Sequence, residues 1–231
     1  MKRLHGVWFV LAASLCAGPA AQAQMGMNFF KKPNITDIFR PVVGKGGVYE
    51  MQNTEKGDAP RSMEMAVVAK ETFEGQDAFW FEVVQNDSRK GQPSYAKILV
   101  TRDFQFHKMV LQQPGQQAME IPFNLNVNDK AKQRRNEELE KWHQAGTETI
   151  AVPAGTFSCV HWQKDEGKGD VWVSDKVSPF GMVKMVSEHE TMTLTKVISD
   201  AKDHITGPVR VFDPQAMRQQ MMDKYQKQPN Q

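Results

Sequence analysis

Cys159 and His161 are the two residues in this sequence that come closest to a reactive pair. They lie two positions apart in residues 156–162, whose alternating pattern predicts a β-strand, so we expect both side chains on one face. A thiol beside an imidazole can serve as nucleophile and base, or supply half of a metal site. No third group that would orient the pair is identifiable, and a small buried thiol beside a surface imidazole is the favoured interpretation. We therefore expect no catalytic residues and no enzymatic activity.

Glu188, His189 and Glu190 lie on a neighbouring predicted hairpin and are the residues that could complete a metal site with Cys159 and His161. Metal sites in proteins show characteristic ligand spacings, and none of those spacings occurs here. Scattered histidines and carboxylates are common on the surfaces of globular proteins. We therefore expect no metal site and no cofactor.

Methionine is the more unusual residue type, with 14 among 231 residues. Thioethers are ligands for Cu(I), and a methionine-rich surface adapts to apolar partners of varied shape. Methionine also fills gaps in a curved hydrophobic core. Gap-filling is the favoured interpretation, and adaptable apolar binding and copper binding remain open alternatives.

The composition is that of a globular protein and excludes several functional classes. Hydrophobic residues make up 40% and charged residues 24%, and the formal net charge is +2. This balance lacks the basic excess of a nucleic-acid-binding protein, so we expect no nucleic-acid partner. Two cysteines are too few for a disulfide-stapled scaffold or a multi-cysteine zinc module.

The N-terminus has the three parts of a secretory signal peptide. Lys2 and Arg3 form a positive region, residues 7–15 are apolar, and residues 21–23 (Ala-Gln-Ala) supply a small-x-small cleavage site. We expect cleavage after Ala23 and a periplasmic location. The apolar stretch is too short to cross a bilayer and no later stretch is longer, so no membrane span is expected.

Cys16 lies at the end of the apolar stretch, where a lipidated cysteine would be found. Leu15 precedes it at a position where lipidation favours a small residue, so we do not expect lipoprotein anchoring. Removal of the signal peptide takes away Cys16 and leaves Cys159 as the single cysteine. It also removes two bases and no acid, which leaves a mature chain without net charge.

After residues 44–47 the apolar residues recur at every second position, which predicts β-strands. The strands follow one another at hairpin spacing, and a sheet of ten or eleven strands must curl because strands twist. We therefore expect a mainly β fold, a single strongly curved antiparallel sheet or half-barrel. The clearest predicted strands are residues 48–52, 63–70, 78–84, 95–101, 104–111, 149–152, 156–162, 170–174, 182–186 and 191–198.

Residues 128–145 interrupt the strands and predict a mid-chain helix that covers the sheet. They are rich in Lys, Arg, Glu and Gln and contain neither Pro nor Gly. The apolar side of this helix is thin, and Leu139 and Trp142 are its expected contacts with the sheet. The chain thus divides into a signal peptide (1–23), a leader with a short helix (24–45), the curved β domain with its helix (46–212), and a C-terminal amphipathic helix with a polar tail (213–231).

Three hairpin motifs carry a resemblance to known proteins. They are Val-Pro-Ala-Gly-Thr-Phe at 152–157, Val-Trp-Val-Ser at 171–174 and Pro-Phe-Gly-Met-Val-Lys at 179–184. They resemble hairpins of uncharacterised secreted bacterial β-rich proteins near the periplasmic lipoprotein-localisation-factor superfamily, and the order of elements is similar over most of residues 46–200. The resemblance implies a half-barrel with helices over its concave face, in which a lipoprotein carrier would load an acyl chain. The motifs themselves supply turn geometry and no catalytic group.

Two functions follow from these observations. The first is an exported binding or carrier protein for an apolar or lipid-like ligand held in the concave face. The alternative is a structural or interaction protein of the cell envelope with a filled core, which acts through a protein partner and uses exposed sheet edges for strand addition. The alternation within 78–84 and 104–111 assigns Phe79, Phe81 and Val83 to one face, and Phe104, Phe106 and Val110 to one face. The residues expected to line a ligand are Met63, Met65, Phe79, Phe81, Val83, Phe104, Phe106, Leu139 and Trp142.

Overall fold

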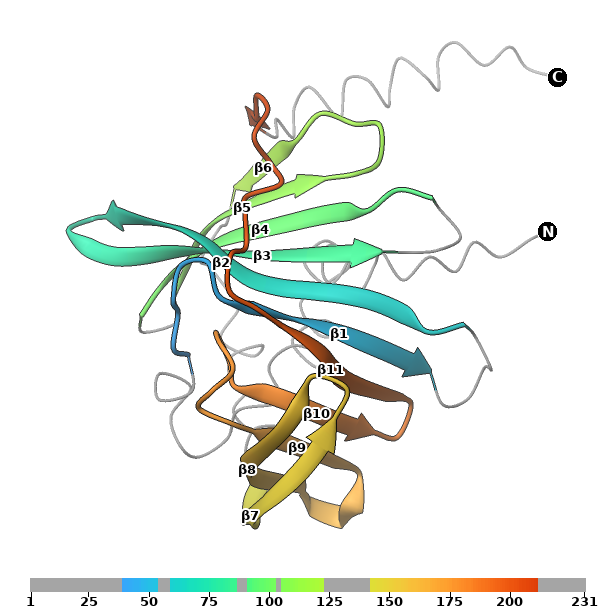
Figure 1. The fold of residues 1–231 in the computed structure, drawn as a ribbon. Coiled ribbons are helices and arrows are strands. Elements are labelled where there is room, and N and C mark those ends of the chain that lie inside the picture. Colours follow the sequence, from blue (N-terminus) through green and yellow to red (C-terminus); the bar gives the residue numbers. More distant parts are fainter. Residues whose placement is uncertain (1–38, 54–58, 87–90, 103–104, 123–141, 212–231) are drawn as a thin grey trace, which may run out of the picture.

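The computed structural model describes residues 39–53, 59–86, 91–102, 105–122 and 142–211. These residues form one curved sheet of twelve strands, whose ends are β12 and β7 (Figure 1). The strand order is β12-β6-β5-β4-β3-β2-β1-β11-β10-β9-β8-β7. The strands are β1 (Gly46–Asn53), β2 (Arg61–Phe73), β3 (Gln76–Asn86), β4 (Ser94–Thr101), β5 (Phe106–Gln112), β6 (Met119–Pro122), β7 (Trp142–Val152), β8 (Gly155–Lys164), β9 (Gly169–Val173), β10 (Met182–Ser187), β11 (Glu190–Ile198) and β12 (Arg210–Val211).

The mainly β class and the single sheet are confirmed, and each of the ten predicted strands overlaps an observed one. The expectation of a purely antiparallel sheet was wrong, because β12 runs parallel to β6. Strand β6 has four residues and β12 has two, which is too few to show an alternating pattern. The helical element of the described residues is a short 3₁₀ turn, η2 (Asp165–Gly167). Among these residues, no helix is long and apolar enough to cross a membrane.

The predicted helix at 128–145 was wrong in its last four residues, which begin strand β7. The backbone of β7 pairs with β8 from Trp142 onward, so β8 satisfies its hydrogen-bonding groups. Residues 128–141, including Leu139, lie outside the described residues. So do the predicted signal peptide, the short helix of the leader and the C-terminal helix.

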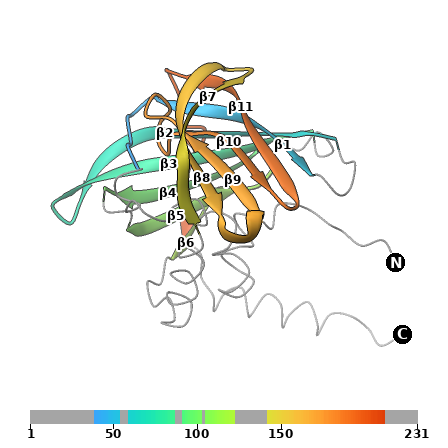
Figure 2. The same ribbon diagram turned by 90° about the horizontal axis from the view of Figure 1, so that it is seen from below.

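Register shifts at β-bulges interrupt five of the strand pairings. A bulge inserts an extra residue in one strand and increases the local twist, which bends the sheet into the curved form seen in Figure 2. The shifts occur between Val48 and Tyr49, Val67 and Ala69, Leu99 and Val100, Gln144 and Gly146, and Met182 and Lys184.

The bulge opposite Leu99 and Val100 corrects one prediction about strand faces. Phe106 pairs with Val100 and Lys108 with Leu99, so His107 is the extra residue. The alternation therefore changes phase after Phe106, and Val110 lies on the opposite face of the sheet. Simple alternation had assigned Phe106 and Val110 to one face.

The two faces of the sheet over β1–β5 are covered differently. The face that carries Tyr49, Met63, Met65, Phe81 and Val83, here called the core face, holds the main hydrophobic cluster. Residues 199–209, here called the strap, cross the opposite face from the end of β11 to β12 (Figure 1). The strap lets the chain leave the middle of the sheet and reach its far edge.

Candidate ligand-binding face

The predicted lining residues are partly brought together by the fold. Met63, Met65, Phe79, Phe81 and Val83 are all buried in the main cluster on the core face. They come from the neighbouring strands β2 and β3, where alternation directs every second side chain to one face. Their role in lining a ligand stays a prediction.

The other four predicted lining residues have different outcomes. Phe106 is partly buried and packs against the main cluster. Trp142 is buried in a separate cluster with Trp162 and Val171. Phe104 and Leu139 lie outside the described residues.

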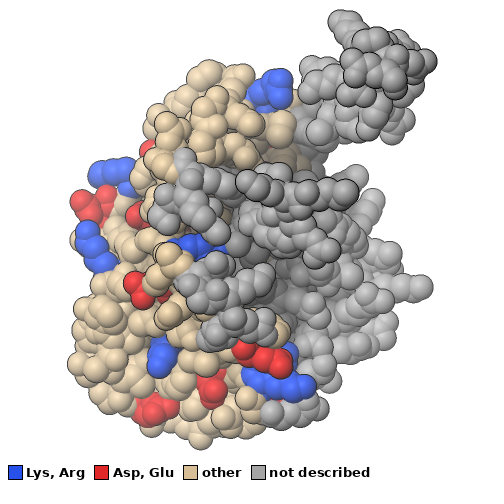
Figure 3. Space-filling view, turned by 90° about the vertical axis from the view of Figure 1, so that its right-hand side faces the viewer, with Lys and Arg blue, Asp and Glu red and all other residues tan. Residues whose placement is uncertain are grey.

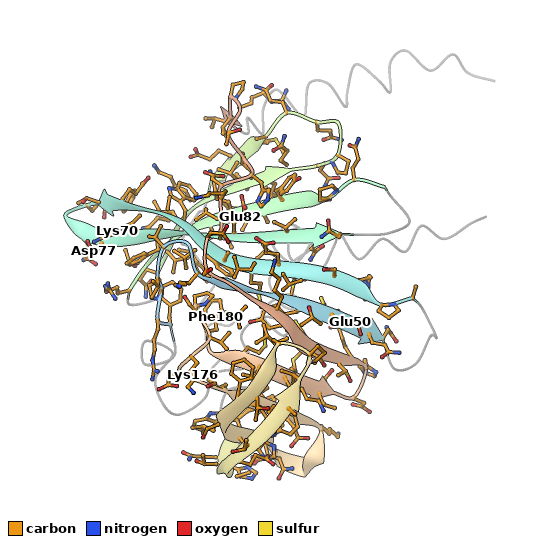
Figure 4. All side chains as sticks on the ribbon, in the orientation of Figure 1. Glu50, Lys70, Asp77, Glu82, Lys176 and Phe180 are labelled. Atoms are coloured by element: carbon orange, nitrogen blue, oxygen red, sulfur yellow. The ribbon has the colours of Figure 1, made fainter. Side chains whose placement is uncertain are left out.

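Phe180 joins the turn before β10 to the core face (Figure 4). Its ring centroid lies 5.1 Å from that of Phe81, nearly perpendicular, and 5.4 Å from that of Phe39. Such edge-to-face contacts add stability beyond the area that they bury. The Pro-Phe-Gly-Met-Val-Lys motif at 179–184 therefore contributes to the core as well as turning the chain.

Methionine is concentrated on this face, because seven methionines belong to the main cluster or pack against it. Three of them form a cross-strand row: Met51 of β1 lies opposite Met192 of β11, which lies opposite Met185 of β10. Directly opposed residues share a face and touch each other. This set of three is here called the methionine row.

The row continues at both ends across neighbouring strands. Beyond Met185 it reaches Val171 and then Trp162, both buried. At the other end, Arg61 of β2 lies directly opposite Met51. The row is therefore apolar over most of its length and ends in a cation.

Arg61 and Glu190 form an ion pair on the core face, at this end of the row. Arg61 Nη2 lies 3.5 Å from Glu190 Oε1, and the two side chains are 12% and 10% exposed. Burial raises the pKa of Glu190, and the nearby Arg61 lowers it by less. The sequence pattern singled out Glu190 only as a metal-ligand candidate and did not single out Arg61.

A second buried carboxyl, Glu82, holds the strap on the opposite face (Figure 4). Its Oε1 lies 2.6 Å from His204 Nδ1, and the backbone N–H of His204 donates to both oxygens. Lys97 beside it pairs with Asp203 at 2.6 Å and donates to the carbonyl of Ile205. Burial raises the pKa of Glu82 more than the contacts with His204 lower it.

These two raised pKa values predict a pH dependence of stability. A carboxyl whose pKa is raised on folding stabilises the fold fully below its unfolded pKa, and that contribution is lost as pH rises through the folded pKa. We expect Glu82→Gln combined with Glu190→Gln to flatten the fall in unfolding free energy between pH 4.5 and neutral pH. Urea denaturation at a series of pH values measures this slope, and Glu50→Gln, which removes an exposed carboxyl on β1, is the control. An unchanged slope in the double variant would contradict the assignment.

Cys159 and His161, the suggested reactive pair, have different hydrogen-bond partners. The Cys159 thiol is buried and donates to the carbonyl of Phe157 at 3.6 Å. His161 Nε2 lies 2.7 Å from Asp170 Oδ1, and its Nδ1 lies 3.0 Å from Glu148 Oε1. Both ring nitrogens therefore face carboxylates, and neither faces the thiol.

The imidazole is held further by stacking. The His161 ring lies 4.6 Å from the Trp172 ring and nearly parallel to it, and Trp172 Nε1 donates to Glu148 at 2.6 Å. This closed network fixes the imidazole between two carboxylates. Sequence reasoning missed Glu148 and Asp170, which lie on the strands on either side of β8.

Cys159 is expected to be unreactive in the folded protein. Burial raises its pKa to about 11, so little thiolate is present at pH 8, and the side chain is almost inaccessible. A thiol reagent should label the mature protein far more slowly under native conditions than in guanidinium chloride. Equal labelling rates in the two conditions would contradict this.

The suggested metal site at Glu188, His189 and Glu190 is not assembled among the described residues. Glu190 turns to Arg61 on the core face, whereas Glu188 and His189 are exposed. In the part of the chain that the structure describes, no group of three or more His, Cys, Asp or Glu is positioned to hold a metal ion.

The surface charges are mixed. Figure 3 shows basic and acidic side chains interspersed on one side of the molecule, among a larger area of other residues. At the tip of the β2–β3 hairpin, for example, Lys70 pairs with Asp77 at 2.7 Å (Figure 4). Among the described residues on this side, the charges therefore do not form a field of one sign.

Comparison with known proteins gives fold neighbours only. No protein-family model and no curated protein matches the sequence. Similar solved structures include a presumed lipoprotein from Parabacteroides distasonis (17% identity, TM-score 0.36, covering 69% of this chain and 97% of that one). Another is a presumed exported protein with a YmcC-like fold from Bacteroides fragilis (13%, TM-score 0.37, 69% and 98%).

A third neighbour is a LolA-superfamily protein from Nitrosomonas europaea (9% identity, TM-score 0.29, covering 76% of this chain and 94% of that one). This is the periplasmic lipoprotein-localisation-factor superfamily, near which the secreted proteins with similar hairpin motifs are placed. At identities of 9–17% and TM-scores of 0.29–0.37, no activity or ligand carries over from these neighbours to this chain.

Proposed function

We propose that this protein is an exported binding or carrier protein of the cell envelope, which holds an apolar, lipid-like ligand against the core face of its curved sheet. The observation that carries the proposal is the concentration of methionines on that face, in and around the methionine row. Methionine side chains are unbranched and flexible, so a surface rich in them adapts to apolar ligands of varied shape.

Two further features support this function. The core face combines these methionines with aromatic rings, including Phe79, Phe81 and Phe180, a lining typical of apolar ligand sites. The N-terminal signal pattern supports export, and a periplasmic location also fits two of the fold neighbours, a presumed exported protein and a presumed lipoprotein. We further propose that the protein is not an enzyme, since Cys159 and His161 have separate partners.

Native mass spectrometry of the mature protein, residues 24–231, purified from the periplasm and then extracted with organic solvent, tests this proposal. We expect a reproducible additional mass that is released as an apolar compound. A bare polypeptide mass, with no uptake when fatty acids or phospholipids are offered, would overturn the carrier function.

A pair of variants makes the experiment specific to the core face. Met185→Glu introduces a carboxylate into the methionine row at a half-buried position and should reduce uptake. Val197→Glu introduces the same group at an exposed position of β11 and should leave uptake unchanged. Equal uptake by the two variants would contradict binding on this face.

Strand β7 favours a second candidate function, interaction with an envelope protein. Among the residues that the structure describes, β7 pairs only with β8, and most of its eleven residues are exposed. An open edge strand can accept a strand from another chain. Crosslinking of the periplasmic protein through residues introduced along β7 would identify such a partner.

A further inference from the structure

Arg61 is a partly buried cation whose hydrogen-bond donors are incompletely used. Its Nη1 atom is buried and has no hydrogen-bond partner among the residues that the structure describes. A guanidinium carries five N–H donors in a planar fork, and a buried charge is costly unless it is paired and hydrogen-bonded. This arginine therefore has an unmet requirement for an acceptor.

Glu190 does not meet that requirement. Its Oε1 lies 3.5 Å from Nη2, at the limit of a hydrogen bond, and it offers nothing to Nη1. Burial also raises the pKa of Glu190, which weakens the carboxylate as a counter-ion. The pair is loose where a stable buried ion pair would be short and bidentate.

Arg61 lies at one end of a row of residues that crosses the sheet. It begins the row that continues through Met51, Met192 and Met185 to Val171 and Trp162. Neighbouring strands lie about 4.8 Å apart, so the five steps from Arg61 to Trp162 span about 24 Å along the sheet. A long apolar row that ends in a loosely paired cation matches the length and the polarity of an amphiphile with one anionic end.

We propose that Arg61 is the head-group site of the ligand-binding face and binds the oxyanion of an acyl compound whose chain lies along the methionine row. This inference rests on the proposed function and narrows its ligand class from apolar compounds to acidic acyl lipids. A guanidinium fork matches a carboxylate or a phosphate through two parallel hydrogen bonds. A neutral alcohol offers one oxygen without charge, so it gains much less from this site.

The test compares two ligands that share a chain and differ in the head group. Palmitate and hexadecanol are each titrated into the mature protein, and binding is measured by displacement of a fluorescent fatty-acid probe. Loss of a charge-assisted hydrogen bond costs about 1.5–3 kcal/mol, or about 10- to 100-fold in affinity. Arg61→Met should therefore weaken the binding of palmitate by at least about 10-fold and the binding of hexadecanol by less than about 3-fold.

Two further variants separate a head-group role from a structural one. Glu190→Gln removes the charge that competes for Arg61, so palmitate binding should tighten, whereas a structural role predicts that it weakens. Arg61→Lys keeps the charge and loses the planar fork of donors, so its affinity for palmitate should lie between those of the wild type and Arg61→Met. Arg210→Met, which removes an exposed arginine on β12, is the matched control and should bind like wild type.

The outcomes distinguish the two proposals. If the wild type binds neither ligand, the proposed function is overturned. If both ligands bind to the wild type but Arg61→Met weakens the binding of both equally, or of neither, only the head-group site is overturned. Should Arg61→Met fail to fold, Glu190→Gln decides, because weaker palmitate binding by that variant overturns the site. Competition by inorganic phosphate alone would identify a free oxyanion, and not an acyl head group, as the ligand of Arg61.

Discussion

Phe81→Ala is expected to destabilise the protein by about 3–5 kcal/mol, the usual cost of truncating a buried phenylalanine. Phe81 lies on the core face between Val67 of β2 and Ile98 of β4, and its ring meets Phe180 edge to face. The substitution removes its contacts with both neighbouring strands and with the turn before β10. Chemical denaturation of the mature protein measures the loss.

The matched control for Phe81→Ala is Val197→Ala on β11. Val197 is 40% exposed and outside the main cluster, so its truncation should change the unfolding free energy by less than about 0.5 kcal/mol. Similar losses for the two variants would mean that Phe81 is not part of a tightly packed core. Such a small loss for Phe81→Ala would favour a core face that is filled by another molecule.

Glu82→Ala is expected to cost about 2–4 kcal/mol and to release the strap. The substitution removes the acceptor of the His204 ring and backbone N–H groups, and hydrogen bonds to a charged group contribute about 1.5–3 kcal/mol, not additively. Hydrogen exchange should rise in residues 199–209 more than in β9 or β10. This regional pattern separates strap release from a uniform loss of stability.

Glu50→Ala is the control for the strap, because Glu50 is an exposed carboxyl on β1 (Figure 4). Its removal should leave both the unfolding free energy and the exchange of the strap unchanged within about 0.5 kcal/mol. If Glu82→Ala destabilises the protein without faster exchange in the strap, the carboxyl supports the sheet and does not anchor the strap.

The strands could be predicted because alternation is strong where one face is buried. Met63, Met65 and Val67 are apolar residues at every second position of β2, and all three lie in the core. The bulge in β5 could not be predicted, since His107 resembles any outward-facing residue of a regular strand. Its position depends on pairing with β4, which a single segment does not encode.

The first part of β7, residues 142–148, was hidden for a related reason. These residues are mostly polar and exposed, so neither hydrophobic alternation nor β-propensity identifies them as a strand. The strand exists because β8 supplies its hydrogen bonds and because Trp142 packs against Trp162 and Val171. Tertiary pairing overrode a local composition that favours a helix.

Part of the candidate ligand-binding face could be predicted from the sequence. The apolar lining on β2 and β3 follows from alternation, whereas Arg61 was overlooked although it is in phase with Met63 and Met65. Arg61 could have been found from the sequence, because it is a charged residue at a position where the alternating pattern requires an apolar one. Glu82 and Lys97 show the same signal within apolar strands, and both are buried.

The order of strands in the sheet constrains when the fold can be completed. Strand β1 has β11 as its second neighbour, and β6 has β12, so residues 190–211 supply the missing neighbour on both sides of the β1–β6 unit. A chain that crosses a membrane from its N-terminus therefore presents β1–β6 with two open edges until almost all described strands have emerged. Unpaired edges are templates for aggregation, and distant pairings form slowly. The proposed export would therefore require protection of the half-translocated chain until the last strands arrive.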